Sequence, residues 1–141
     1  MGRIIVHVHG KIKDQSLNAL MQTYSKRLDS ESIKIIFHSD SLSAKEYLEK
    51  LIFHVKNGEL ILLDAQGLTL DSIEFSNLVK NWKLNSTQTH LAIGPAEGFP
   101  QSDFSKISLS SLTFPHEFAF VILIEQIYRS IQIIKGTKYH K

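Results

Sequence analysis

Residues 90–116 read HLAIGPAEGFPQSDFSKISLSSLTFPH, and this stretch decides the fold class. Two apolar segments, His90–Ile93 and Ile107–Leu109, have the length and composition of buried strands. The first ends at Gly94-Pro95, a pair typical of turns. Pro115 then precedes a long helical pattern from His116 to Lys135. The stretch therefore predicts two short strands, each followed by a loop, and then a helix.

The same alternation extends toward the N-terminus. Runs rich in β-branched residues predict strands, and apolar residues at helical spacing predict helices. The elements predicted there are strands at Arg3–Val8, Ile33–Phe37 and Glu59–Leu63, and helices at Gln15–Leu28, Ser43–Lys56 and from Asp71 onward, with Glu74 as capping-box partner of Asp71. Strands that alternate with helices predict an α/β fold, an open and mostly parallel sheet with helices on both faces.

The length of 141 residues fits a single domain spanning residues 1–141. Cysteine is absent, which excludes disulfides, zinc-thiolate sites and a cysteine nucleophile and favours a cytoplasmic location. The longest apolar run, Phe118 to Ile124, is too short to cross a bilayer, so we expect no membrane partner. The seven histidines have no acidic or cysteine partner at ligand spacing, so we expect no metal site.

The net charge of +2 is weaker than most RNA-binding domains show, so an RNA contact would need local clustering or the pooled charge of two subunits. The helix from His116 to Lys135 has apolar residues on more than one face, which indicates burial on two sides and a possible subunit interface. In open α/β sheets, ligands bind at the carboxyl ends of the strands. The loops after Leu63, Ile93 and Leu109 are therefore the predicted binding region.

These loops and other segments of the chain carry a recognisable set of short motifs: Leu63-Asp64-x-x-Gly67, Trp82-Lys83-Leu84, Ile93-Gly94-Pro95-Ala96-Glu97-Gly98, Leu109 to His116, Glu125-Gln126-Ile127-Tyr128-Arg129 and Tyr139-His140-Lys141, with Gly10-Lys11 and Tyr24-Ser25-Lys26-Arg27-Leu28 near the start. In this order they resemble the RlmH family of SPOUT methyltransferases, which act on ribosomal RNA. The family usually has a second glycine where Pro95 stands, and proline reduces the freedom of this loop.

The resemblance implies homodimers with a deep C-terminal trefoil knot and a substrate site built across two subunits. It implies methylation of N3 of a pseudouridine in 23S ribosomal RNA, within the ribosome, with S-adenosylmethionine as methyl donor. The cofactor contacts that it implies are Leu63, Gly94, Leu109, Ser110, Ser111, Leu112, Thr113 and Phe114. The expected RNA-binding residues are His116, Arg129, Tyr139, His140 and Lys141, of which Arg129, Tyr139 and His140 are also the expected catalytic residues.

Each of these assignments has an ordinary structural alternative. Residues 109–114 could be only a core strand and a turn, and Gly94 and Gly98 could serve turn geometry alone. His116 could cap its helix, and Arg129 could form an ion pair with Glu125 one turn earlier rather than contact a phosphate. The terminal residues could simply be frayed. Either His140 or solvent could accept the N3 proton.

Three functions therefore stand at this point. The first is the methyltransferase. The second is a ribosome-binding or cofactor-binding protein of the same fold with impaired catalysis. The third, which ignores the resemblance, is a generic α/β nucleotide-binding domain.

Overall fold

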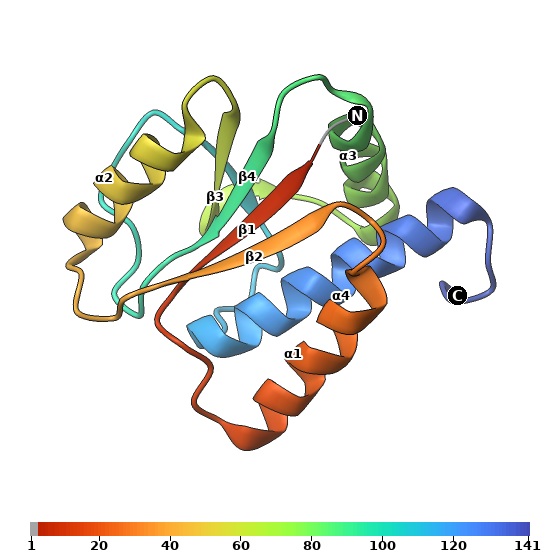
Figure 1. Cartoon of the computed structure of the whole chain (residues 1–141), viewed down its shortest axis with the longest axis horizontal. Coiled ribbons are helices and arrows are strands. Elements are labelled where there is room, and N and C mark those ends of the chain that lie inside the picture. Colours follow the sequence, from red (N-terminus) through yellow and green to blue (C-terminus); the bar gives the residue numbers. More distant parts are fainter. Residues whose placement is uncertain (1–2) are drawn as a thin grey trace.

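A computed structural model describes residues 3–141 and shows strands and helices alternating along most of the chain (Figure 1). The elements are β1 (Ile4–His9), α1 (Gln15–Leu28), β2 (Ile33–His38), α2 (Ala44–Val55), β3 (Glu59–Thr69), α3 (Ser72–Leu84), β4 (Thr89–Ile93), β5 (Ser105–Ser108) and α4 (His116–Lys135). The predicted bounds of α1 and α4 are confirmed, and Asp71 caps α3 in a capping box with Glu74.

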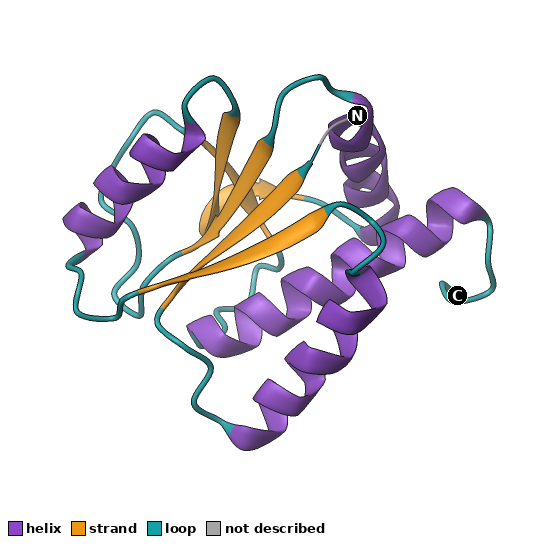
Figure 2. Cartoon of the chain, viewed as in Figure 1, coloured by secondary structure: helices purple, strands orange, loops and turns teal. Residues whose placement is uncertain are grey.

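The five strands form one sheet in the order β2-β1-β4-β3-β5, and every pair is parallel. Helix α2 covers one face, and α1, α3 and α4 cover the other (Figure 2). The predicted α/β fold with helices on both faces is therefore confirmed. The trefoil knot stays a prediction drawn from the resemblance.

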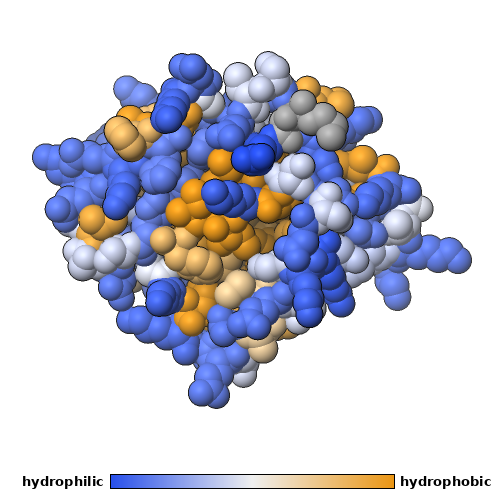
Figure 3. All heavy atoms as spheres, in the orientation of Figure 1, coloured by the Kyte–Doolittle hydropathy of each residue, from blue (hydrophilic) through white to orange (hydrophobic). Residues whose placement is uncertain are grey.

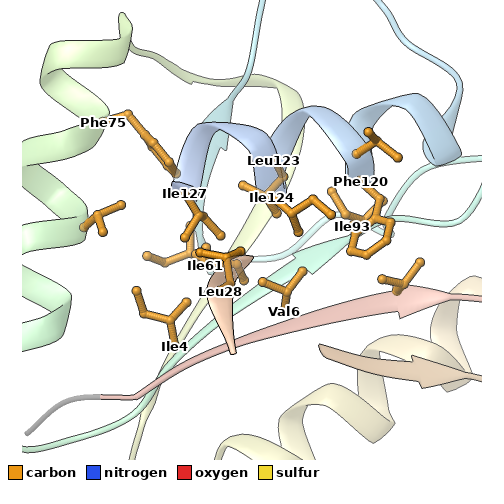
Figure 4. Packing of buried hydrophobic residues seen from close by; sticks show 14 of the residues in the cluster. Ile4, Val6, Leu28, Ile61, Phe75, Ile93, Phe120, Leu123, Ile124 and Ile127 are labelled. Carbon is orange, nitrogen blue, oxygen red and sulfur yellow. The ribbon is translucent and has the colours of Figure 1, made fainter. Parts of the chain in front are cut away.

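The larger core layer lies between the sheet and the three helices on its one face; Figure 4 shows the part of it between the sheet and helices α3 and α4. Its centre holds Val6 of β1, Ile93 of β4 and Ile124 of α4, all at most 2% exposed. The smaller layer packs Tyr47, Leu48 and Leu51 of α2 against β3 and β4; its complete buried set is Tyr47, Leu48, Leu51, Leu60, Leu62 and Ala92. Ile52, next to Leu51 on the same helix, is 47% exposed.

Helix α4 uses most of its apolar surface in the core of its own chain. The predicted apolar positions Val121, Ile124, Ile127 and Ile131 are buried. Phe118 and Ile134 remain exposed, by 49% and 41%. Within the described residues 3–141, no helix has the length and apolar character needed to span a membrane.

Three buried histidines form a hydrogen-bonded row across neighbouring strands under α2. His7 Nδ1 lies 2.8 Å from His38 Nε2, and His7 Nε2 lies 2.8 Å from His90 Nδ1. The rings thus bond to one another rather than converge on a common point, and no group of three or more metal-binding side chains occurs among residues 3–141. Burial lowers the pKa of His7 to about 3, assisted by the charges of His38 and His90, and it lowers the pKa of His38 to about 4.

We expect the histidine row to make the protein sensitive to acid. Burial also lowers the pKa of His90, so below the ordinary histidine pKa of about 6.5 the unfolded chain binds protons that the folded chain does not. Stability should be constant above about pH 6.5 and fall as the pH drops toward 4, by at most about 1.4 kcal/mol per pH unit for each histidine. Urea unfolding between pH 7.5 and 4.5 measures this slope.

The matched variant for that experiment is His7→Leu, which removes the middle ring of the row. We expect it to lower stability at neutral pH, because His38 and His90 lose their partners, but to give a flatter loss in acid. If the stability of the variant decreased equally steeply in acid, groups other than these histidines would be the cause of the loss.

Candidate functional site

A cleft of about 410 Å³ lies at the carboxyl ends of β3, β4 and β5, beside the start of α4. This volume is within the range of small-molecule sites. The lining residues are Leu63, Asp64, Ala65, Ile93, Gly94, Pro95, Ala96, Glu97, Gly98, Phe99, Ser108, Leu109, Ser110, Leu112, Thr113, Phe114, Pro115, His116 and Ala119. The cleft is thus where the parallel-sheet rule predicts a ligand.

The first wall is an irregular segment inside β3, where the prediction of a strand ending at Leu63 was wrong. Leu63 and Leu68 both pair with Ile107, so the residues between them leave the ladder and the strand resumes to Thr69. Asp64 shapes this bulge by accepting a hydrogen bond from the backbone N–H of Gln66. A side chain at Gly67 would meet the backbone of Ile107 at 2.6 Å, so the Asp-x-x-Gly pattern has a structural cause here.

The second wall is the loop after β4. The Gly98 N–H donates to the Pro95 carbonyl at 2.8 Å, and Gly98 has a φ of +85°, which favours glycine. At Gly94, a Cβ atom would lie 3.1 Å from two atoms of the Phe99 ring. Gly94 therefore lines the cleft and also allows Phe99 to pack closely against the loop.

Tyr47 of α2 supports this second wall from inside the protein. Its hydroxyl donates to the Ile93 carbonyl at 2.7 Å, and its ring stacks on Phe99 with centroids 5.7 Å apart. The side chain is fully buried, and burial raises the pKa of Tyr47. Tyr47 thus fixes both ends of the segment from Ile93 to Phe99. This role of Tyr47 was not predicted from the sequence, because the helical spacing of Tyr47 indicates only a core position.

The third wall is the loop from Leu109 to Phe114, which its own hydroxyl groups hold in shape. Ser108 Oγ donates to the Ser110 carbonyl at 2.7 Å, and Ser110 Oγ accepts from the Leu112 N–H at 3.0 Å. Leu112 is 69% exposed at the mouth of the cleft. The small polar residues of this loop therefore fold the backbone, while larger apolar side chains are presented to a ligand.

The chemistry of the cleft suits a ligand with one apolar part and one cationic part. Apolar side chains and peptide groups make up most of the lining, and Asp64 and Glu97 add carboxylates. A planar ring can pack on the apolar side chains, and a cation is attracted by the carboxylates. S-adenosylmethionine, expected from the resemblance, has an adenine ring for the apolar side chains and sulfonium and ammonium groups for the carboxylates. The residues present fit it when its own carboxylate lies away from Asp64 and Glu97.

A second cluster of functional side chains lies at the far end of α4. Gly136, with a φ of +73°, ends the helix and lets the chain turn back. Tyr139 packs edge-on against Tyr128 with centroids 4.9 Å apart, and its hydroxyl donates to Glu125 Oε2 at 2.8 Å. The tail is therefore held against the helix rather than frayed.

Arg129 connects this cluster. Its guanidinium forms an ion pair with Glu125 at 2.9 Å and donates from Nη1 to His140 Nδ1 at 3.1 Å. It also lies 5.0 Å from the centre of the Tyr139 ring. Hydrogen bonding to Glu125 raises the pKa of Arg129, so the group stays cationic. Arg129 therefore forms the ion pair with Glu125, and the same guanidinium can also contribute to the functional cluster.

The structure divides the predicted site residues between these two places. Of the expected cofactor contacts, Leu63, Gly94, Leu109, Ser110, Leu112, Thr113 and Phe114 line the cleft; Ser111 is exposed in the same loop and is not part of the lining. His116 also lines the cleft, whereas Arg129, Tyr139 and His140 lie together at the other end of α4. Lys141 is exposed at the end of the chain.

Two members of the tail cluster were not predicted from the sequence. Tyr24 of α1 brings its hydroxyl to within 3.2 Å of the Tyr139 hydroxyl. Glu125 was considered only as a partner of Arg129, but it also binds Tyr139. Both residues belong to segments that resemble the family, and this was the available signal for them.

Comparison with known proteins shows similarity along nearly the whole chain. A family model described as "Predicted SPOUT methyltransferase" matches residues 2–140. A protein of Malacoplasma penetrans named ribosomal RNA large subunit methyltransferase H is 33% identical over 99% of both chains. Proteins of the same name from Caldicellulosiruptor bescii and Clostridium botulinum are 36% and 35% identical, over 94% of this chain and 96% and 95% of theirs.

Proposed function

The chain belongs to the SPOUT methyltransferase family, and from this premise we propose that it methylates N3 of a pseudouridine in 23S ribosomal RNA with S-adenosylmethionine as methyl donor. The relatives with full-length similarity are named as methyltransferases of large-subunit ribosomal RNA. The observation that carries the proposal is the cleft at the ends of β3, β4 and β5, lined by seven of the expected cofactor contacts. We further propose that residues 1–141 act as one domain, in the cytoplasm and on the ribosome.

The cofactor would be held by the three walls of the cleft. Peptide groups of the Leu109 to Phe114 loop would bind the adenine edge, while Leu112 and Phe114 pack against the ring. Asp64 and Glu97 would balance the positive charge of the sulfonium and the amino group. Gly94 and Phe99 pack closely against each other in the wall formed by the loop after β4.

The reaction is a direct displacement. When bound, S-adenosylmethionine would supply its methyl group to N3 of the base: the N3–C bond would form as the S–C bond breaks, a thioether would leave, and the N3 proton would be lost. Such a step needs alignment of nitrogen, methyl carbon and sulfur more than it needs an acid or a metal. The protein therefore has to bind the cofactor rigidly and to hold the base in line with it.

The two clusters are too far apart to serve one reaction within one chain. His116, at the cleft, and Arg129, at the tail, are thirteen residues apart on α4, which is about 20 Å along a helix. The base and the methyl group must be in contact for transfer. We propose that the tail of one subunit completes the cleft of the other in a homodimer.

Exposed apolar side chains support this assembly. The apolar area in the middle of Figure 3 lies over edge strand β2 and the start of α4, the elements that carry the exposed Phe37 and Phe118. Leu112 at the mouth of the cleft is exposed as well. A second copy would cover such side chains in an isologous contact. Sedimentation should show a dimer at micromolar concentration.

Mixed dimers test the shared site. A chain lacking Tyr139 to Lys141 keeps its cleft, and a Gly94→Val chain keeps its tail. Each homodimer should be nearly inactive. Random pairing of the two chains should restore about a quarter of the wild-type activity, because half of the dimers are mixed and each mixed dimer has one complete site. A co-expressed mixture without activity would show that each chain uses its own tail.

Titration calorimetry with S-adenosylmethionine tests the cofactor site directly. Saturable binding is expected for the wild-type protein, and nucleotides without the methionine part should bind more weakly. Absence of binding would remove the basis for the methyltransferase proposal.

A further inference from the structure

The protons of the tail cluster can be assigned from donor and acceptor chemistry alone. The Glu125 carboxylate only accepts, and the Tyr139 hydroxyl approaches it at 2.8 Å, so the single phenolic proton of Tyr139 is directed at Glu125. The contact of 3.2 Å between Tyr24 and Tyr139 must then use the proton of Tyr24. Burial and these hydrogen bonds raise the pKa of Tyr139. Tyr139 is therefore a neutral, fully engaged hydroxyl and cannot take a proton from a substrate.

The same reasoning fixes the tautomer of His140. Arg129 Nη1 lies 3.1 Å from His140 Nδ1, and a guanidinium can donate hydrogen bonds but cannot accept them. The Nδ1 atom of His140 must therefore be the acceptor and carries no proton. A neutral imidazole with a bare Nδ1 has its proton on Nε2. Glu125 supports this arrangement because it binds the Nε and Nη2 groups of Arg129 and so directs Nη1 to the histidine.

The Nε2–H group is left for a ligand. Among residues 3–141, no hydrogen bond of the structure uses this atom of His140, and the side chain is half-buried beside Arg129 and Tyr139. We propose that His140 meets the target base as an Nε2–H donor to a carbonyl oxygen next to N3, and that the N3 proton leaves to solvent. This inference rests on the proposed function and assigns the role of one residue within it.

A donor at this place accelerates the reaction in a definite way. When N3 loses its proton, the negative charge spreads onto the two carbonyl oxygens that flank it. A fixed donor stabilises this charge and favours proton loss to water, after which N3 attacks the methyl carbon and the thioether leaves. Removal of one such donor typically lowers the rate by about 10²–10³-fold. A base at the same place would need an unprotonated Nε2, which the contact with Arg129 opposes.

Two amide substitutions separate the two roles. The amide nitrogen of glutamine reaches the position of imidazole Nε2 and can donate, whereas that of asparagine reaches only the position of Nδ1; neither amide is a base. In single-turnover assays on ribosomes that lack the modification, His140→Gln should stay within about tenfold of the wild-type rate. His140→Asn should be slower by about 10²–10³-fold. Equal loss in both variants, or full activity in both, would overturn the donor role.

The pH profile gives an independent readout. If solvent takes the proton, the logarithm of the wild-type rate should rise steadily between pH 6 and 8.5, and the Gln variant should follow the same slope. If His140 were the base, the wild-type rate would reach a plateau with increasing pH, and the Gln variant would lack that plateau.

The tautomer can be measured without any activity. Nitrogen-15 NMR of the histidine-labelled protein at pH 7.5 should show His140 with a bare Nδ1 and a protonated Nε2, assigned by the signals missing in His140→Gln. Arg129→Gln should allow the two tautomers to mix. A protonated Nδ1 in the wild-type protein would contradict the inference even if methyl transfer is found. Absence of methyl transfer with the expected tautomer would instead count against the proposed function and against a role of this donor in it.

Discussion

Deletion of Tyr139 to Lys141 is expected to lower methyl transfer to ribosomes by about 10³-fold and to leave the Kd of S-adenosylmethionine within a few-fold. The physical reason is the separation of the two clusters. The tail lies at the far end of α4 from the cleft of its own chain, and none of its residues lines that cleft. The deletion removes the ring of Tyr139 and the donor of His140 without touching the cofactor walls.

The measurement compares single-turnover transfer with calorimetric cofactor binding for the truncated and the full-length chain. Lys138→Ala is the matched control, because Lys138 is exposed and directly precedes the deleted segment; we expect it to keep both properties. Transfer at close to the full rate would show that the tail is dispensable. Joint loss of cofactor affinity and transfer would place the tail in the cofactor site of the dimer.

The substitution Gly94→Val should raise the Kd of S-adenosylmethionine by at least about 100-fold, which corresponds to about 2.8 kcal/mol. A Cβ atom added at this position would lie 3.1 Å from the Phe99 ring, and valine adds two further methyl groups. Phe99 cannot easily retreat, because its ring stacks on Tyr47, which is fully buried and bonded to the Ile93 carbonyl. The loop must therefore shift into or away from the cleft.

The fold should tolerate this change, since the loop lies outside the sheet ladder, and thermal unfolding should show only a modest decrease in Tm. The double variant Gly94→Val with Phe99→Ala tests this steric explanation, because removal of the Phe99 ring leaves space for the valine side chain. We expect it to recover part of the affinity. A Kd for Gly94→Val close to wild type would mean that the cofactor does not depend on this loop.

Most of the fold could be predicted from the sequence because the relevant signals are local. Helical spacing gave the bounds of α1 and α4, and alternation of strands with helices gave the parallel sheet. The cleft followed from the rule that ligands bind at the carboxyl ends of parallel strands. The continuation of β3 beyond Asp64 was missed because four bulged residues interrupt its ladder, and a polar turn followed by glycine is a typical end of a strand.

Several of the missed side-chain contacts join residues that are distant in sequence. His7 meets His38 and His90 over 31 and 83 positions, and Tyr24 meets Tyr139 over 115. No periodicity reports such pairs, because each residue alone fits an ordinary core or surface position. The sequence also did not reveal that the predicted RNA-binding residues lie at two separate places. His116 and Arg129 belong to one helix, and the length of that helix separates them in space.

Transfer of the labelled methyl group from S-adenosylmethionine to ribosomes that lack the modification tests the central claim most directly. The purified protein should label 23S ribosomal RNA only, at a single site, and nuclease digestion with mass spectrometry should identify an N3-methylated pseudouridine. Cofactor binding without any incorporation would contradict catalysis and would leave a cofactor-binding protein of the same fold. Label on another nucleotide or another RNA would contradict the proposed substrate.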